Sequence, residues 1–115
     1  MKRGEIWTVA GGAAYAGKPR PAVIVQDDRF DANDSIVVCP LTADPTAAPI
    51  FRLPVRPSTQ SGLRAPCRMM VDKVTAVPRT RLGTLVGSLT TEEIRALNRA
   101  LFVFLGLSET EREAG

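Results

Sequence analysis

Short apolar segments separated by glycine- and proline-rich turns run through most of this chain, and they predict β-strands. Residues 5–9 alternate in polarity around aromatic and β-branched side chains, as expected of a strand with one buried face. Residues 22–26 and 35–41 are nearly continuous apolar runs, which predict two neighbouring buried strands. Further strands are predicted over residues 51–55, 67–77 and 82–89.

Proline and glycine residues indicate the position and the shape of two of the later predicted strands. Pro54 has no amide proton to donate to a ladder, so residues 51–55 are predicted to form an edge strand. Gly83 and Gly87 interrupt residues 82–89, which predicts bends or a close backbone approach in the last strand.

One amphipathic helix is predicted at the C-terminal end, over about residues 91–105. Thr90 and Glu93 have the spacing of a capping box, in which each side chain satisfies a backbone donor at the helix start. The apolar residues that recur at helical spacing on one face are Ile94, Leu97, Leu101, Phe104 and Leu105. Val103 falls roughly opposite Ile94, so the last turns are apolar nearly all round, which fits either a subunit contact or packing within one chain.

These elements together predict a mostly β fold, a strongly bent sheet or small barrel followed by one helix. At 115 residues, 44% of them hydrophobic, the chain has the size of a single domain. We expect this domain to span residues 1–107, with the charged segment 108–115 as a frayed tail. Because small domains bury little of their surface, a second copy is expected to cover an apolar face.

The chain contains no histidine, and this absence restricts its chemistry more than any other feature. Histidine is the usual general base, the commonest transition-metal ligand and the standard partner of a nucleophilic Ser or Cys. None of these roles can be filled by histidine in this chain. Cys39 and Cys67 match no zinc spacing, and we expect two buried, reduced thiols. The carboxylates within residues 27–34 lie in a turn-like stretch where solvated side chains are the simpler interpretation, so neither a metal nor another cofactor is expected.

Charge and hydropathy give weaker indications of partners and location. The net charge of +3, with a pI near 9.3, slightly favours a polyanionic partner. No apolar run of signal-peptide length follows the N-terminal charges, and no stretch is long enough to span a bilayer. We therefore expect a cytoplasmic protein without a membrane partner.

Several segments, taken in order, resemble the MazF/PemK family of toxin endoribonucleases, the mRNA interferases of type II toxin–antitoxin systems. The segments are RGEIW (3–7), KPRPAVIVQDDRF (18–30), VCPLT (38–42), VDKVTAVPRTRLG (71–83) and the closing helix. The resemblance implies an SH3-like small β-barrel of the CcdB/PemK kind with a C-terminal helix, and a homodimer. It also implies metal-independent cleavage of single-stranded mRNA at short sequence motifs, and neutralisation by a cognate antitoxin peptide.

The resemblance also implies roles for particular residues. Arg20, followed by Pro21, matches the catalytic arginine of the family, and Thr42 matches its catalytic threonine at the end of the third strand. Many family members carry a GSEQ-like stretch before this arginine, where the present chain has AAYA (13–16) and Tyr15 stands in place of the frequent Glu. The proton acceptor therefore stays open among Tyr15, Asp27 and Asp28, unless the reaction proceeds without one.

RNA cleavage without a metal starts with attack of a ribose 2′-hydroxyl on the adjacent phosphate, and it is expected to give 2′,3′-cyclic phosphate and 5′-hydroxyl ends. Arg20 suits stabilisation of the developing charge or proton donation, because a guanidinium with a pKa above about 12 is a poor base. Thr42 suits orientation of a phosphate oxygen through its hydroxyl. Considered alone, Arg20 pairing with a carboxylate and Thr42 ending a strand are simpler interpretations.

RNA contacts are predicted from residue type and from position near these motifs. Tyr15 lies in a glycine-rich loop, where it is expected to stack on an unpaired base, whereas Trp7 is expected in the core. Basic residues are expected to line a groove along the RNA backbone. The predicted RNA-binding residues are Tyr15, Lys18, Gln26, Asp27, Arg29 and Arg68, with Arg52, Arg56 and Arg64 as further basic candidates.

Two other functions stay open at this point. One is a non-catalytic poison of the same fold, resembling CcdB, which binds a topoisomerase (gyrase) rather than RNA. The other is an inactive relative that binds RNA or sequesters an antitoxin, suggested by the AAYA stretch.

Overall fold

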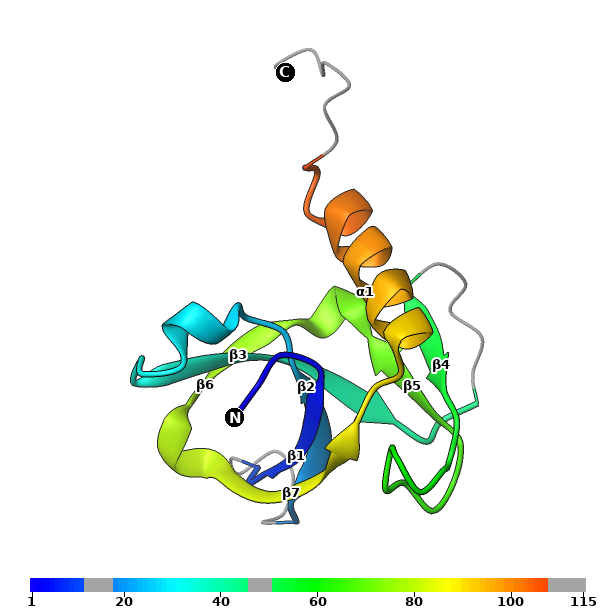
Figure 1. Cartoon of the computed structure of the whole chain (residues 1–115), viewed down its shortest axis with the longest axis horizontal. Coiled ribbons are helices and arrows are strands. Elements are labelled where there is room, and N and C mark those ends of the chain that lie inside the picture. The colour runs from blue at the N-terminus through cyan, green and yellow to red at the C-terminus, as the bar shows by residue number, and fades with distance from the viewer. Residues whose placement is uncertain (12–17, 46–50, 108–115) are drawn as a thin grey trace.

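The computed structural model describes residues 1–11, 18–45 and 51–107, which form seven strands, three short 3-10 helices and one α-helix (Figure 1). The strands are β1 (Glu5–Val9), β2 (Arg20–Ile24), β3 (Ser35–Thr42), β4 (Arg52–Val55), β5 (Cys67–Met70), β6 (Thr75–Pro78) and β7 (Leu82–Ser88). The helices are η2 (Asp28–Phe30), η3 (Val71–Lys73), η4 (Arg79–Arg81) and α1 (Thr91–Phe104).

All strand pairs within these residues are antiparallel, and β3 lies at their centre. The strand order is β4-β5-β3-β2-β1-β7, and β6 pairs with the first half of β3. The end of β3 pairs with β5, while β2 pairs along the other edge of β3. In Figure 1, β3, β6, β7, β1 and β2 curl around a common interior, and α1 projects from one side of this ring. The predicted small β-barrel with a C-terminal helix is therefore confirmed.

The prediction of one continuous strand over residues 67–77 is wrong, because η3 separates this segment into β5 and β6. Leu41 pairs with Met69, and Val38 pairs with Thr75, so the β5–β6 side contains three more residues than β3 between these pairs. The extra residues form η3, whose Val71 side chain is buried in the core. A local apolar pattern does not distinguish this insertion from a continuous strand.

Both faces of the central strands are buried, because alternate side chains enter two separate clusters. The first, which we name the helix-side cluster, packs beneath α1 and includes Val23, Leu41, Met69 and Leu97. The second, the barrel cluster, consists of Ala22, Ile24, Ile36 and Val38, with Trp7 packed against it. Trp7, predicted in the core, is partly buried at the edge of this cluster.

The helix α1 begins as its sequence predicts, but Leu105, predicted on its packed face, follows the last helical residue and is 55% exposed. Thr90 N–H donates to Glu93 Oε1 at 2.8 Å, and Glu93 N–H donates to Thr90 Oγ1 at 3.1 Å, which completes the capping box. Leu97 is fully buried, and Phe104 packs edge-on against Phe51 with 5.1 Å between the ring centroids.

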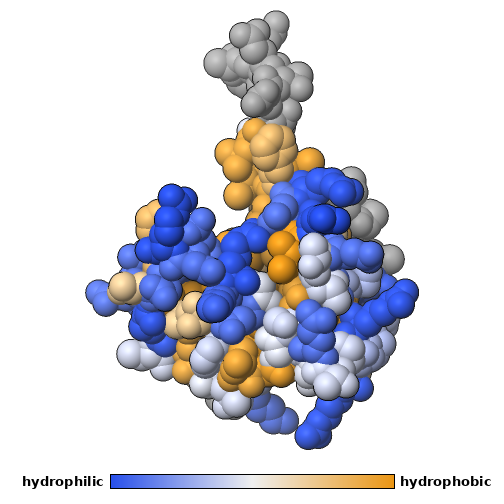
Figure 2. Space-filling model, viewed as in Figure 1, coloured by the Kyte–Doolittle hydropathy of each residue, from blue (hydrophilic) through white to orange (hydrophobic). Residues whose placement is uncertain are grey.

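Beyond this packed face, the end of α1 exposes large apolar side chains. We name the group formed by Phe102, Val103, Leu105 and Leu107 the apolar end of α1. Figure 2 shows hydrophobic surface over the part of the helix that projects from the barrel. Within one copy of the chain, the described residues leave these side chains 46–59% exposed. Of the two interpretations of the last helical turns, the structure therefore favours a contact outside the single chain.

The glycine and proline positions behave as predicted. A Cβ atom at Gly87 would clash with the backbone carbonyl oxygens of Gln60 and Ser61, because the loop before β5 packs directly on β7. Pro54 lies in β4, the terminal strand of the sheet order, where its missing amide proton is tolerated. No helix among the described residues is both long enough and apolar enough to cross a membrane.

Candidate active site

Arg20 and Thr42 lie at the same end of two adjacent strands, although they are far apart in the sequence. Arg20 begins β2 and Thr42 ends β3, and the antiparallel register pairs Ala22 with Pro40. Arg20 lies two residues before Ala22 and Thr42 two residues after Pro40, so a register that continued unbroken would set them opposite each other. Opposed residues of an antiparallel pair point to the same face, with Cβ atoms about 4.5–5.5 Å apart. The structure thus places the two predicted catalytic residues at the same end of paired strands.

Arg68 extends this pair into a row across three strands. It lies directly opposite Thr42 in the pairing of β3 with β5. With strands about 4.8 Å apart, the row of Arg20, Thr42 and Arg68 spans about 10 Å between its outer Cα atoms. Leu41 and Met69, the adjacent residues on the two strands, enter the helix-side cluster, so the row faces away from α1. Arg20 is exposed, while Thr42 and Arg68 are partly buried.

A cavity of about 370 Å³ opens at the Arg68 side of this row. Its lining comes from the end of β3 and the residues after it, from Pro54 on β4, and from residues 65–68. The volume falls in the range of clefts that hold small ligands. On the other side of Thr42, Arg20 lines a hollow of about 60 Å³ with Pro40 and Thr75. Recessed surface therefore borders the row on both sides.

The hydroxyl of Thr42 is held by a local hydrogen bond. The backbone N–H of Asp44 donates to Thr42 Oγ1 at 3.1 Å, which forms a turn at the end of β3. Because the oxygen accepts this bond, the hydroxyl proton remains to be donated to another group. The arrangement can present one hydroxyl donor beside two guanidinium groups, which suits a phosphate.

The predicted RNA-binding residues divide between two places. Lys18 is exposed just before Arg20, and Arg68 belongs to the row itself. Gln26, Asp27 and Arg29 lie in the loop joining β2 to β3, at the opposite end of these strands from Arg20 and Thr42. A strand of this length separates the two ends by on the order of 15 Å. The structure therefore does not bring these three residues to the row, and Tyr15 lies outside the described residues.

All three loop residues are engaged in local contacts. Gln26 Oε1 accepts from Val37 N–H at 2.9 Å, and Gln26 Nε2 donates to Phe30 O at 2.8 Å. Asp27 accepts from the backbone N–H of Arg29 and forms a 3.0 Å ion pair with its side chain. These hydrogen bonds, and then the charge of Arg29, hold the pKa of Asp27 below its ordinary value. The contacts order the loop around η2.

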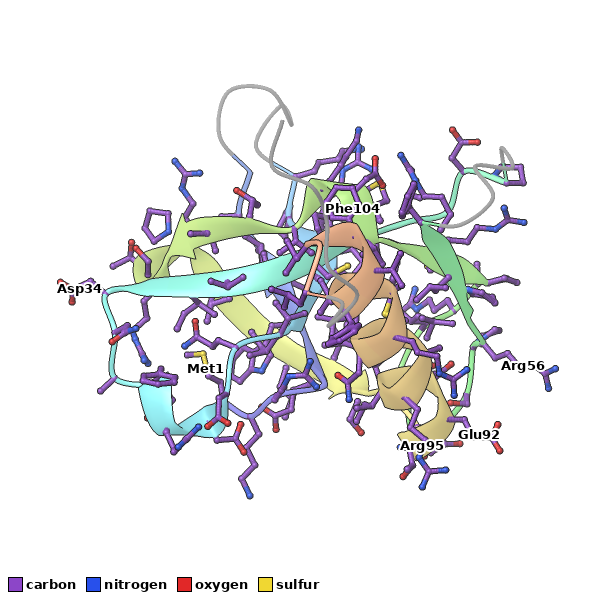
Figure 3. The ribbon with its side chains drawn as sticks, turned by 90° about the horizontal axis from the view of Figure 1, so that it is seen from above. Met1, Asp34, Arg56, Glu92, Arg95 and Phe104 are labelled. Carbon is purple, nitrogen blue, oxygen red and sulfur yellow. The ribbon has the colours of Figure 1, made fainter. Side chains whose placement is uncertain are left out.

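The remaining basic candidates are also dispersed. Arg52 pairs with Asp72 at 3.2 Å, on the segment between β5 and β6. Arg56 lies near the start of α1, and Figure 3 shows it at the opposite end of the molecule from Asp34, in the β2–β3 loop. Arg64 is exposed before β5. In the parts of the chain that the structure describes, basic residues thus converge at the row but not over one continuous groove.

Sequence reasoning missed two residues of the cavity, Asp44 and Cys67. The signal for Asp44 was its spacing, because a carboxylate two residues after a strand-ending threonine lies in the turn that the threonine forms. Cys67 was expected to be buried, but it is only partly buried, and this limited burial raises the pKa of its thiol. Cys39 is fully buried as expected, and burial, with a smaller effect of the Asp72 charge, raises the pKa of its thiol to about 12.

Comparison with known proteins identifies the family. Residues 2–105 match the family described as PemK-like, MazF-like toxin of type II toxin-antitoxin system. The chain belongs to this toxin family. This MazF-like chain is 47% identical over 108 residues to a probable endoribonuclease MazF of Mycolicibacterium smegmatis, covering 94% of the chain and 99% of that relative. It is 29% identical over 116 residues to the endoribonuclease MazF9 of Mycobacterium tuberculosis, covering 93% and 98%.

Solved structures share the fold of this MazF-like chain at low sequence identity. An endoribonuclease from a mycobacterial species, solved in complex with its cognate antitoxin, has a TM-score of 0.78 at 21% identity, covering 94% of the chain and 97% of its own. A MazE–MazF crystal structure from Deinococcus radiodurans has a TM-score of 0.76 at 17% identity, covering 94% and 97%. The MazF/PemK resemblance and its barrel fold are thereby confirmed.

Proposed function

We propose that this chain is an endoribonuclease toxin that cuts single-stranded mRNA at short sequence motifs without a metal ion. The observation that carries the proposal is the juxtaposition of Arg20 and Thr42 at one end of β2 and β3. The names of its relatives, a probable endoribonuclease MazF and an endoribonuclease MazF9, support the same activity. The substrate is an RNA whose scissile phosphate rests on the row of Arg20, Thr42 and Arg68.

Each residue of the row contributes a different interaction to the reaction. Arg20 donates N–H groups to the phosphate oxygens and stabilises the charge that develops on them during attack. Thr42 donates its hydroxyl proton to one phosphate oxygen and so sets the orientation of the phosphate. Arg68 attracts the RNA backbone from the other side of Thr42. Lys18, and more remotely Gln26, Asp27 and Arg29, contact the strand outside the cut.

The nucleophile in this proposal is the 2′-hydroxyl adjacent to the scissile phosphate. Its attack forms a 2′,3′-cyclic phosphate and releases a 5′-hydroxyl end. A chain with no histidine requires other residues to supply the proton transfers of this step.

The proposed toxin acts as a homodimer and is neutralised by an antitoxin peptide. The apolar end of α1 supports the dimer, because it leaves exposed the kind of surface that a second copy buries. The antitoxin is suggested by the relatives solved together with their antitoxins.

The activity is tested by incubating the full chain with a long single-stranded RNA in excess chelator and mapping the product ends. The proposal expects cuts at a recurrent short motif, with cyclic phosphate on one end and a 5′-hydroxyl on the other. An RNA that stays intact, or cuts abolished by the chelator, would contradict it. Inhibition of gyrase with intact RNA would instead identify a CcdB-like poison, and RNA retention without products would identify an inactive binder.

A further inference from the structure

An acidic residue lines the cavity beside Thr42, whereas the row of Arg20, Thr42 and Arg68 contains none. Asp44 is the acidic residue among the described residues that line this cavity. The other lining side chains named so far bring a hydroxyl, a guanidinium, a thiol and a proline ring. A carboxylate accepts hydrogen bonds, whereas the guanidinium groups of the row only donate them.

The backbone of Asp44 is tied to the hydroxyl that is expected to hold the phosphate. Its N–H donates to Thr42 Oγ1 at 3.1 Å, and only Cα and Cβ separate this nitrogen from the carboxylate group. The carboxylate therefore stays close to Thr42 in each of its rotamers. A phosphate that accepts a hydrogen bond from Thr42 would bring its attached ribose next to Asp44.

The other acidic candidates lie elsewhere. Asp28 Oδ1 accepts from Arg3 N–H at 2.6 Å, and Asp27 pairs with Arg29, both in or beside the loop at the far end of β2 and β3. Asp72 forms an ion pair with Arg52 rather than lining the cavity. Neither of the two carboxylates that the sequence suggested as proton acceptors is near Arg20 and Thr42.

We propose that Asp44 accepts the proton of the attacking 2′-hydroxyl, and that the cavity holds the nucleotide which carries this hydroxyl. The inference rests on the proposed function. In RNA, this nucleotide lies on the 5′ side of the scissile phosphate. With the phosphate between Arg20 and Thr42, its base enters the cavity between Pro54 and Arg68, where apolar ring surface and a guanidinium plane suit a nucleobase.

The step balances without any further reactant. The 2′ O–H bond breaks and its proton passes to the Asp44 carboxylate, while the 2′ oxygen forms a bond to phosphorus. The bond from phosphorus to the 5′ oxygen then breaks, and this oxygen leaves with the electron pair and takes a proton from water. Asp44 returns its proton to solvent, and the products are a 2′,3′-cyclic phosphate and a 5′-hydroxyl.

Asp44→Asn is the direct test, because it keeps the size of the side chain and the backbone N–H that donates to Thr42 Oγ1. We expect the single-turnover cleavage rate to fall about 10²–10⁴-fold, the usual effect of losing a general base, with unchanged affinity for an uncleavable 2′-deoxy analogue. Asp44→Glu should restore part of the rate. Asp34→Asn, an exposed change in the β2–β3 loop, is the matched control and should cut at the wild-type rate.

A substrate with sulfur in place of the bridging 5′ oxygen separates proton acceptance from other roles, because a thiolate leaves without needing a proton. The defect of Asp44→Asn should persist on this substrate, and the cleavage rate of this variant should rise with pH as hydroxide replaces the lost base. Rescue by sulfur, a loss explained by weaker binding, or full activity of Asp44→Asn would overturn the role of Asp44. Failure of the wild type to cut any RNA would instead overturn the proposed function.

Discussion

Arg68 lies directly opposite Thr42 where β5 pairs with the end of β3. Arg20 begins β2, which pairs along the other edge of β3, so an arginine lies on the strand to either side of this threonine. This face is the one turned away from α1, since the alternate residues Leu41 and Met69 are buried beneath the helix. An anionic strand that crosses the ends of β2, β3 and β5 would therefore meet all three side chains.

Arg68→Ala should weaken RNA binding more than it slows the chemical step. Loss of one phosphate contact is expected to lower the slope of log affinity against log salt concentration by about one, and to do so for RNAs of any sequence. The measurement is binding of an uncleavable 2′-deoxy analogue at several salt concentrations. Arg95→Ala, an exposed change on α1, is the control. An unchanged salt dependence of Arg68→Ala would remove this residue from the RNA contacts.

Thr90→Ala should destabilise the protein by about 1 kcal/mol, because Glu93 N–H loses its side-chain acceptor in the capping box. Equilibrium denaturation by urea measures this change in the free energy of unfolding. Thr91→Ala is the matched control, since Thr91 is exposed at the first helical position, whereas Thr90 is the N-cap. Equal stability of Thr90→Ala and Thr91→Ala would show that the capping box adds nothing measurable.

The two thiols should differ in reactivity. The pKa of Cys39 is raised to about 12 by burial, so at pH 8 its thiol is protonated as well as inaccessible. Burial also raises the pKa of Cys67, but this thiol lines the cavity and should react with iodoacetamide slowly. Mass spectrometry of the native protein should find one label, located on Cys67, and of the unfolded protein two. Equal labelling of both cysteines in the native protein would contradict the burial of Cys39.

Replacing two side chains of the apolar end of α1 by lysine should shift the proposed dimer to monomer. Val103 and Leu105 are 59% and 55% exposed, so Val103→Lys with Leu105→Lys leaves the packing of α1 on the barrel in place. Sedimentation velocity measures the change, and circular dichroism verifies the fold. Arg95→Glu, on the exposed side of α1, should remain dimeric. A wild-type chain that sediments as a monomer at all concentrations would refute the dimer.

The sequence predicted the elements well where local chemistry determines them. Thr90 and Glu93 specify the helix start through their own backbone contacts, and the alternation of residues 5–9 matches β1. The division of residues 67–77 depends on how the chain follows β3, and this is a non-local constraint. The site residues show the same contrast between what sequence patterns indicate and what depends on the folded chain. The resemblance supplied Arg20 and Thr42, whereas Gln26 and Asp27 follow Arg20 closely in sequence but lie a full strand away from it.

The account depends on Arg20 and Thr42 acting on one and the same phosphate, and a double-mutant cycle tests this most directly. Single-turnover cleavage rates are measured in excess chelator for wild type, Arg20→Ala, Thr42→Val and the double variant, with Arg95→Ala as a control that keeps full activity. We expect each single change to cost about 10²–10³-fold, and the double variant to be little slower than the slower single variant. Losses that multiply fully, or wild-type rates in either single variant, would contradict a shared site of action.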